Sequence, residues 1–222
     1  MTVGTADYFD AAIHLPTGGR LVLHAVEWEE YEHLLDQLGD SSHLRVSYNA
    51  GRLEIMSPSN KHEKLKNLIN SFVNAVCYEL NTEWLSLGSV TLKQHPLGSG
   101  AEADDCFYFE AANSIIRKER LNLATDPPPD IVVEIDLINE SSGKLDSYAS
   151  FGVPEVWRYV REHVEIMNLA GGKYETVETS RFFSMVTASR IMEFISECES
   201  AGQLRAQRRL RDWLAAVKGS KS

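Results

Sequence analysis

Hydrophobic residues along this chain recur at two different spacings, and the change from one to the other predicts the order of its elements. Helical spacing over residues 28–39 predicts a helix that is ended by the final glycine of this segment. Alternating residues on both sides of a turn at 49–51 then predict the two strands of a hairpin. The clearest amphipathic helix follows within residues 57–81, with Ser59 or Asn60 as its N-cap.

The rest of the chain predicts mainly strands and then helices. Residues 131–137, with the sequence IVVEIDL, are almost continuously apolar, which is typical of a central strand covered on both faces. Other strands are expected at 84–87, 89–92, 106–109, 155–160, 164–169 and 173–178, and other helices at 111–120, 141–151, 190–198 and 203–217. We therefore predict a single α/β domain across residues 1–222.

The composition is that of an ordinary globular protein. Hydrophobic residues make up 43% of the 222 residues and charged residues 24%, which excludes a disordered or fibrous chain and suits one domain with a substantial core. The formal net charge of −10 opposes non-specific adhesion to a phosphate backbone. Any contact with nucleic acid must therefore be local.

Cysteine usage and the N-terminal segment bear on the cellular compartment. Cys77, Cys106 and Cys198 lie inside apolar patterns and lack the spacing of a disulfide framework or of a thiolate zinc site. The first residues have no basic start followed by an apolar run, and no window approaches the ~18 apolar residues of a membrane span. We expect a soluble protein of the reducing cytoplasm with no membrane partner.

Two acidic clusters are the chemically informative feature of the sequence. Glu134 and Asp136 lie two residues apart on the apolar strand, so both side chains project to one face while Ile135 projects to the other. Buried carboxylates need a charged partner or a metal ion. If Asp104 begins a neighbouring strand, three acids can converge on a hard divalent cation, which prefers oxygen ligands.

Four stretches together resemble the Uma-type (Uma-two) family of restriction endonucleases, a largely bacterial group placed in the PD-(D/E)xK nuclease superfamily. The resembling stretches are GRLEIMSPSNKHEKL, GAEADDCFYFE, PPPDIVVEIDLINESSGKLDSYASFGVPEVWRY and GQLRAQRRLRDWL. The resemblance implies a restriction-endonuclease-like mixed β-sheet flanked by helices, with an added N-terminal helix and hairpin and added C-terminal helices. It places the nuclease-like core at about 43–180 and a C-terminal helical extension at about 188–218.

The same resemblance implies a Mg²⁺ or Mn²⁺ site. Asp104 would be the motif aspartate and Glu134 the motif acid, and the backbone carbonyl of Ile135 would be a further ligand. Two positions depart from the family pattern, because Ala103 replaces the proline before the aspartate and Asp136 occupies the place of the motif lysine. Asp136 itself is either a further metal ligand or a structural ion-pair partner.

A replacement for the missing lysine is Lys144, in the first turn of the next predicted helix. It could reach back to Glu134 and stabilise charge on a reacting phosphate; the alternative is a solvated helix lysine. His62 lies within about 30° of the centre of the apolar face of its helix, whereas Glu63 lies about 130° away. In the family a histidine at this place resembles an active-site neighbour, so His62 is expected to be a metal-shell or phosphate-orienting group; the alternative is a hydrogen-bonded core histidine.

Three other acids are expected to be solvated rather than ligands, namely Glu102, Asp105 and Glu110. Asp105 would exchange roles with Asp104 if the strand register slipped by one residue. The basic run in 203–217 either touches phosphates or forms an oligomer contact or a surface stripe.

The leading functional hypothesis is a divalent-metal-dependent endonuclease that hydrolyses phosphodiester bonds of DNA, with a homodimer expected by symmetry. The alternative is a catalytically inactive module of the nuclease fold that binds nucleic acid or assembles with proteins. A function in a different pocket, with the acids only structural, ranks last because the sequence has no GxSxG, HExxH or glycine-rich phosphate loop.

Overall fold

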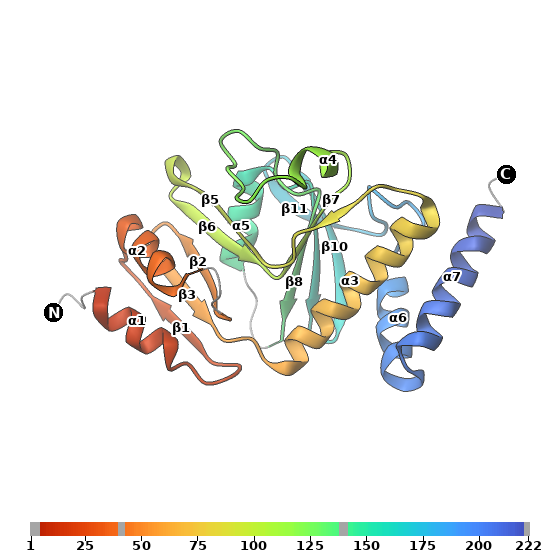
Figure 1. Ribbon diagram of the computed structural model, residues 1–222, viewed down its shortest axis with the longest axis horizontal. Helices are drawn as coiled ribbons and strands as arrows, with labels where there is room; N and C mark the ends of the chain where they lie inside the picture. Colours follow the sequence, from red (N-terminus) through yellow and green to blue (C-terminus); the bar gives the residue numbers. More distant parts are fainter. Residues whose placement is uncertain (1–4, 40–42, 138–141, 220–222) are drawn as a thin grey trace.

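Two β-sheets surrounded by helices make up the computed structural model, which describes residues 5–39, 43–137 and 142–219 (Figure 1). The helices are α1 (Thr5–Ile13), α2 (Trp28–Leu38), α3 (Asn60–Leu80), α4 (Ala112–Ile115), α5 (Ser142–Phe151), α6 (Ala188–Ala201) and α7 (Gln203–Gly219), with a 3₁₀ turn η1 (His95–Leu97). The strands are β1 (Arg20–Leu23), β2 (Arg45–Asn49), β3 (Arg52–Met56), β4 (Leu85–Ser86), β5 (Val90–Gln94), β6 (Ser99–Ala103), β7 (Asp105–Tyr108), β8 (Ile131–Asp136), β9 (Glu155–Val160), β10 (His163–Ala170) and β11 (Lys173–Val177).

The first sheet is antiparallel and has the strand order β1-β3-β2-β6-β5. Alternation along the hairpin directs Val46, Leu53 and Ile55 into a core shared with Tyr31 and Leu34 of α2. Helices α1 and α2 lie together at this end of the molecule (Figure 1). The predicted hairpin therefore belongs to the first sheet rather than to the sheet that contains β8, and the predicted helix α2 packs against it.

The second sheet is mixed and has the strand order β11-β10-β9-β8-β7-β4, with β8 parallel to β9. Helix α3 and helix α6 pack on one face, where Phe72, Phe194 and Trp157 belong to the same core. Helix α5 covers the other face, where Tyr148 packs with Val132. Every residue of β8 is buried, which confirms the predicted central strand.

The chain passes from one sheet to the other at a single residue, Asp104. Strand β6 ends at Ala103 in the first sheet, and β7 begins at Asp105 in the second. Because Asp105 pairs with Val133 in an antiparallel register, Asp104 lies beside Glu134. The topology thus brings the two acidic clusters together where the sheets meet.

The α/β fold class is confirmed, while several local details differ from the prediction. The helix expected at 111–120 is only the four-residue α4, because residues 117–120 are all exposed and offer no apolar stripe to bury. Strand β6 was not predicted, since its sequence SGAEA has low strand propensity. Pairing with β2 and β5 overrides that propensity, and Gly100 lets the strand pass against the Tyr31 side chain, which a Cβ would meet at 2.3 Å. Across the part of the chain described, no helix combines the length and apolarity needed to cross a lipid bilayer.

Candidate active site

A small cavity of about 20 Å³ lies where the two sheets meet. Its lining residues come from the β2–β3 hairpin, the junction of β6 and β7, strand β8 and helix α5, and they are Arg45, Ser47, Glu54, Met56, Asp104, Glu134, Ile135, Asp136 and Lys144. The volume has room for about one water-sized occupant. The predicted metal-site residues all line this cavity together with the replacement lysine.

Asp104 is held in place by two neighbours and keeps one oxygen without a donor. Its Oδ2 accepts a hydrogen bond from the backbone N–H of Ile135 at 2.8 Å and lies 3.0 Å from His62 Nε2. Burial acts to raise the pKa of Asp104, but the Lys144 cation and the His62 hydrogen bond hold it below its ordinary value. Oδ1 is buried and accepts no hydrogen bond from any described residue. Arg45 Nε lies 3.7 Å from Oδ1, which is beyond hydrogen-bond distance, so Oδ1 can still coordinate a ligand in the cavity.

Glu134 and Lys144 form a buried ion pair. Lys144 Nζ donates to Glu134 Oε2 at 2.9 Å and to the backbone carbonyl of Glu102 at 2.9 Å, and the Tyr148 hydroxyl donates to Glu134 Oε1. Burial raises the pKa of Glu134 to about 8, even though the Lys144 cation opposes the shift. Burial acts to lower the pKa of Lys144, but the Glu134 and Asp104 carboxylates raise it above its ordinary value. Lys144 is therefore a buried cation, and the alternative of a solvated helix lysine is wrong.

His62 faces the sheet, as its place on the helix predicted. Ser59 is the N-cap of α3 and accepts a hydrogen bond from the His62 backbone N–H at 3.2 Å, which fixes the first helical turn. The His62 ring is buried and its Nε2 lies 3.0 Å from Asp104 Oδ2, so His62 contacts the predicted motif aspartate but does not itself line the cavity. Glu63, on the other side of the turn, is 39% exposed and forms an ion pair with Lys66 at 2.6 Å.

Asp105, the acid next to Asp104, forms hydrogen bonds away from the cavity. Asp105 is buried, and its carboxylate accepts hydrogen bonds from Asn70 at 2.7 Å and Ser86 at 3.0 Å. Burial raises its pKa despite these bonds. The expectation of solvated side chains is wrong for Asp105 and for the largely buried Glu102, and correct for Glu110. Asp105 does not line the cavity, whereas Asp104 does.

Sequence reasoning missed the part of the cavity that the first sheet supplies. Arg45, Ser47, Glu54 and Met56 line it from β2 and β3. The alternation of residues in the hairpin could have predicted them. Once Val46 and Ile55 are assigned to the core, these four residues share the opposite face.

The donor set fits a hard divalent cation. The cavity lining contains four carboxylates and two cations, and Glu54 is already paired with Arg20 at 2.6 Å and Arg52 at 2.7 Å, which lie outside the lining. The other three acids, Asp104, Glu134 and Asp136, supply the oxygen ligands that a hard divalent cation prefers. The Oδ1 atom of Asp104, which is buried and accepts no hydrogen bond, is the oxygen most directly able to coordinate such an ion. Within the described ranges, however, no three or more His, Cys, Asp or Glu side chains are already gathered in the geometry of a metal site.

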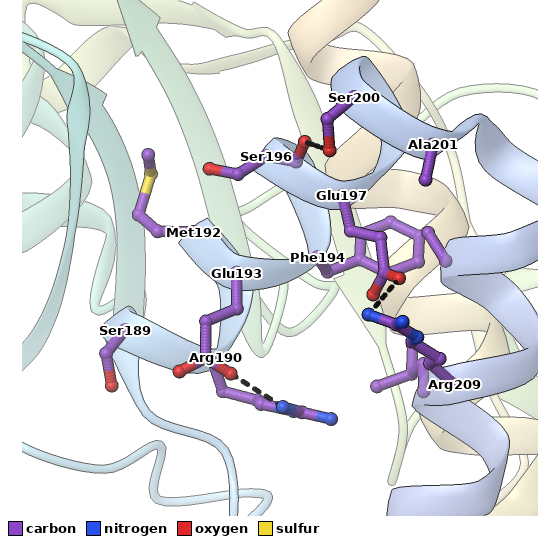
Figure 2. Close-up of a pocket in the computed structure, with 12 residues that line it drawn as sticks. Ser189, Arg190, Met192, Glu193, Phe194, Ser196, Glu197, Ser200, Ala201 and Arg209 are labelled. Atoms are coloured by element: carbon purple, nitrogen blue, oxygen red, sulfur yellow. Dashed lines mark hydrogen bonds and ion pairs between the residues drawn. The ribbon is translucent and has the colours of Figure 1, made fainter.

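A second, larger cavity of about 620 Å³ lies along the groove between α6 and α7, and Figure 2 shows the side chains around it. Its charged residues are paired with one another, Arg190 with Glu193 at 2.6 Å and Arg209 with Glu197 at 2.7 Å. None of the predicted site residues lines it. The acidic cavity is therefore the candidate active site.

The two sheets, one of them mixed, and the helices that cover them define the chain as an α/β protein. The sequence matches the family described as "Putative restriction endonuclease" (Uma2) over residues 28–198, which is more than half of the chain, and the chain belongs to this family. The resemblance inferred from the sequence is thereby confirmed.

The fold is also similar to that of a solved protein from Anabaena variabilis, titled "a putative nuclease belonging to DUF820". The TM-score is 0.52, the alignment covers 76% of this chain and 98% of that chain, and 14% of the residues are identical. At this identity the likeness concerns the fold alone. No curated protein matches the chain.

Proposed function

We propose that this protein is a divalent-metal-dependent endonuclease that hydrolyses phosphodiester bonds of DNA. The observation that carries the proposal is the buried Asp104 oxygen without a donor, which faces the same cavity as the Glu134–Lys144 pair. Membership of the restriction endonuclease family supports the reaction class and a nucleic-acid substrate. Cleavage of both strands of a duplex often uses two copies of one site, so a homodimer is part of the proposal.

The residues that would hold Mg²⁺ or Mn²⁺ are Asp104, Glu134, Asp136 and the backbone carbonyl of Ile135. Such an ion, when bound, supplies a Lewis acid and lowers the pKa of a coordinated water. Lys144 keeps a positive charge inside the cavity, where it stabilises negative charge that develops on the scissile phosphate.

Three groups act on the metal-binding carboxylates rather than on the substrate. His62 and the N–H of Ile135 fix the Oδ2 atom of Asp104, which leaves Oδ1 directed to the cavity. The Tyr148 hydroxyl likewise fixes Oε1 of Glu134. These contacts hold the two carboxylates in the orientation that the reaction requires, before any ligand binds.

The test is cleavage of plasmid DNA in the presence of Mg²⁺ or Mn²⁺. We expect Asp104→Asn and Glu134→Gln each to reduce the cleavage rate at least about a hundredfold, as loss of a charge-stabilising group does in other active sites. Asp105→Asn is the matched control, because this neighbouring acid is equally buried but lies outside the cavity. Unchanged cleavage in both cavity variants would overturn the assignment.

A second candidate function is a non-catalytic module of the nuclease fold. The observation that favours it is the acid Asp136 at the place of the motif lysine. If the unaltered protein binds DNA but neither cleaves it nor binds Mg²⁺ or Mn²⁺, the non-catalytic function is the correct one.

A further inference from the structure

The β2–β3 hairpin turns a polar face toward the acidic cavity. Because strand residues alternate, Val46 and Ile55 pack in the core with α2, while Arg45, Ser47 and Glu54 line the cavity. An antiparallel hairpin with one apolar face commonly has its other face in water. Here that other face lies against carboxylates from both sheets, so its charged residues are candidates for a role in the site.

Arg45 contacts three carboxylates, and each contact is long. Its Nη1 lies 3.2 Å from Glu102 Oε1, its Nη2 lies 3.4 Å from Glu63 Oε1, and its Nε lies 3.7 Å from Asp104 Oδ1. A tight charge-assisted hydrogen bond between a guanidinium and a carboxylate measures about 2.7–2.9 Å. Arg45 is therefore attracted by three acids without being locked to any one of them.

Arg45 also retains donors that no described residue uses. A guanidinium has about five N–H donors. Nη1 of Arg45 donates to Glu102 and Nη2 donates to Glu63, but the buried Nε donates to no described residue. Only 9% of the side chain is exposed, so water does little to satisfy these groups. Lys144, the other cation of the cavity, already donates to Glu134 and to the Glu102 carbonyl. The unused donor capacity of the cavity thus lies mainly on Arg45.

We propose that Arg45 binds a non-bridging oxygen of the phosphodiester at this cavity, a role that rests on the phosphodiesterase function proposed above. A phosphate anion is repelled by the acidic lining and needs cations beside it. Once Asp104 is neutralised by a divalent ion, Arg45 keeps Glu102 and Glu63 as partners, and its Nε and remaining N–H groups are free to meet an anion. The Nε–H group, which has no hydrogen bond, would donate to this one oxygen, in a cavity with room for about one atom of that size.

The experiment compares Arg45→Gln, Arg45→Lys and the control Arg52→Gln in two binding measurements. Arg52 lies on the same hairpin and its removal changes the net charge equally, but its side chain is 36% exposed, pairs with Glu54 and does not line the cavity. Binding of Mn²⁺ alone is measured by titration calorimetry. Binding of a fluorescein-labelled DNA duplex is measured by anisotropy with Ca²⁺ as the divalent ion.

The two measurements are expected to diverge for Arg45. Arg45→Gln should bind Mn²⁺ at least as tightly as the unaltered protein, because a competing cation next to Asp104 is gone, while its duplex affinity falls about tenfold or more. Arg45→Lys keeps the charge but loses the planar fork, so duplex affinity should fall about threefold to tenfold with Mn²⁺ binding unchanged. Arg52→Gln should stay within about twofold in both measurements.

Parallel losses of Mn²⁺ and duplex affinity in Arg45→Gln would overturn the proposal, because they are the signature of a purely structural arginine. Full duplex affinity in either Arg45 variant would overturn it as well. If Arg45→Gln does not fold, the charge-preserving Arg45→Lys carries the test with the same criteria. Absence of Mn²⁺ binding to the unaltered protein is a distinct result, which overturns the proposed function and this role together.

Discussion

Replacing Lys144 by methionine removes the cation that balances the buried carboxylate of Glu134. Both side chains are almost fully buried, 9% and 2% exposed, and Nζ lies 2.9 Å from Oε2. Removing one partner of a buried ion pair destabilises a protein by about 3–5 kcal/mol, because the other charge stays buried without compensation. A domain of this kind is stable by only about 5–15 kcal/mol, so the loss is a large fraction of the total.

The assay is urea denaturation at pH 9 without divalent ions, followed by circular dichroism, because Glu134, with a pKa of about 8, is ionised at that pH. With an m-value of about 2–3 kcal/mol/M, the midpoint should fall by about 1–2.5 M. Lys93→Met is the matched control, because Lys93 and Glu32 are 2.8 Å apart but 41% and 42% exposed. An exposed pair of this kind contributes about 0–1 kcal/mol, so the control midpoint should move little.

The loss caused by Lys144→Met should also depend on pH. Burial raises the pKa of Glu134 to about 8, above its ordinary value of 4.5, so the folded state favours the protonated carboxyl. A group with a raised folded-state pKa contributes stability that is complete below its unfolded pKa and is lost as the pH rises through its folded pKa. The lysine compensates this loss, so its removal should cost less at pH 6 than at pH 9.

A double variant separates the ion pair from mere packing. Glu134→Gln removes the charge that Lys144 balances, so Lys144→Met should cost much less in that background than in the unaltered chain. A loss below about 1 kcal/mol at both pH values would refute the reasoning. An equal loss in the Glu134→Gln background would refute it too, because the cost would then have another origin.

Three further predictions concern the parts of the fold that position the site. Leu68→Ala, in the core under α3, should cost about 2–5 kcal/mol, whereas Leu204→Ala, 68% exposed, should stay within about 0.5 kcal/mol; similar urea midpoints would contradict this. Gly100→Ala should cost about 1–3 kcal/mol, because its Cβ would meet Tyr31 at 2.3 Å, and an unchanged thermal midpoint would contradict it. Ser59→Ala removes the N-cap of α3 and should cost about 0.5–2 kcal/mol; unchanged hydrogen exchange in the first turn would show that the cap is dispensable.

Much of the candidate site could be predicted because it depends on local periodicity. Alternation on a near-continuous apolar strand sufficed to place Glu134 and Asp136 on one face, and both line the cavity. Helical angles sufficed to separate the buried His62 from the half-exposed Glu63. The family resemblance, together with the place of Lys144 in the first turn of α5, led to the prediction that it reaches Glu134.

The remaining parts of the site depend on tertiary structure, which local patterns do not record. The chain bends at Asp104 as it leaves one sheet for the other, so the alternation that would expose its neighbour is interrupted and Asp105 is buried as well. Arg45 comes from a hairpin in the other sheet, and only the packing of the two sheets brings it to the acids. Strand β6 consists of small residues and forms because two neighbouring strands pair with it.

The central claim is that Asp104 and Glu134 form a divalent-cation site, and titration calorimetry with Mn²⁺ tests it most directly. The account predicts saturable binding to the unaltered protein, a loss of at least about tenfold in affinity in Asp104→Asn, and unchanged binding in Asp105→Asn. Equal Mn²⁺ affinity in the unaltered protein and in Asp104→Asn, or no binding to the unaltered protein, would contradict it.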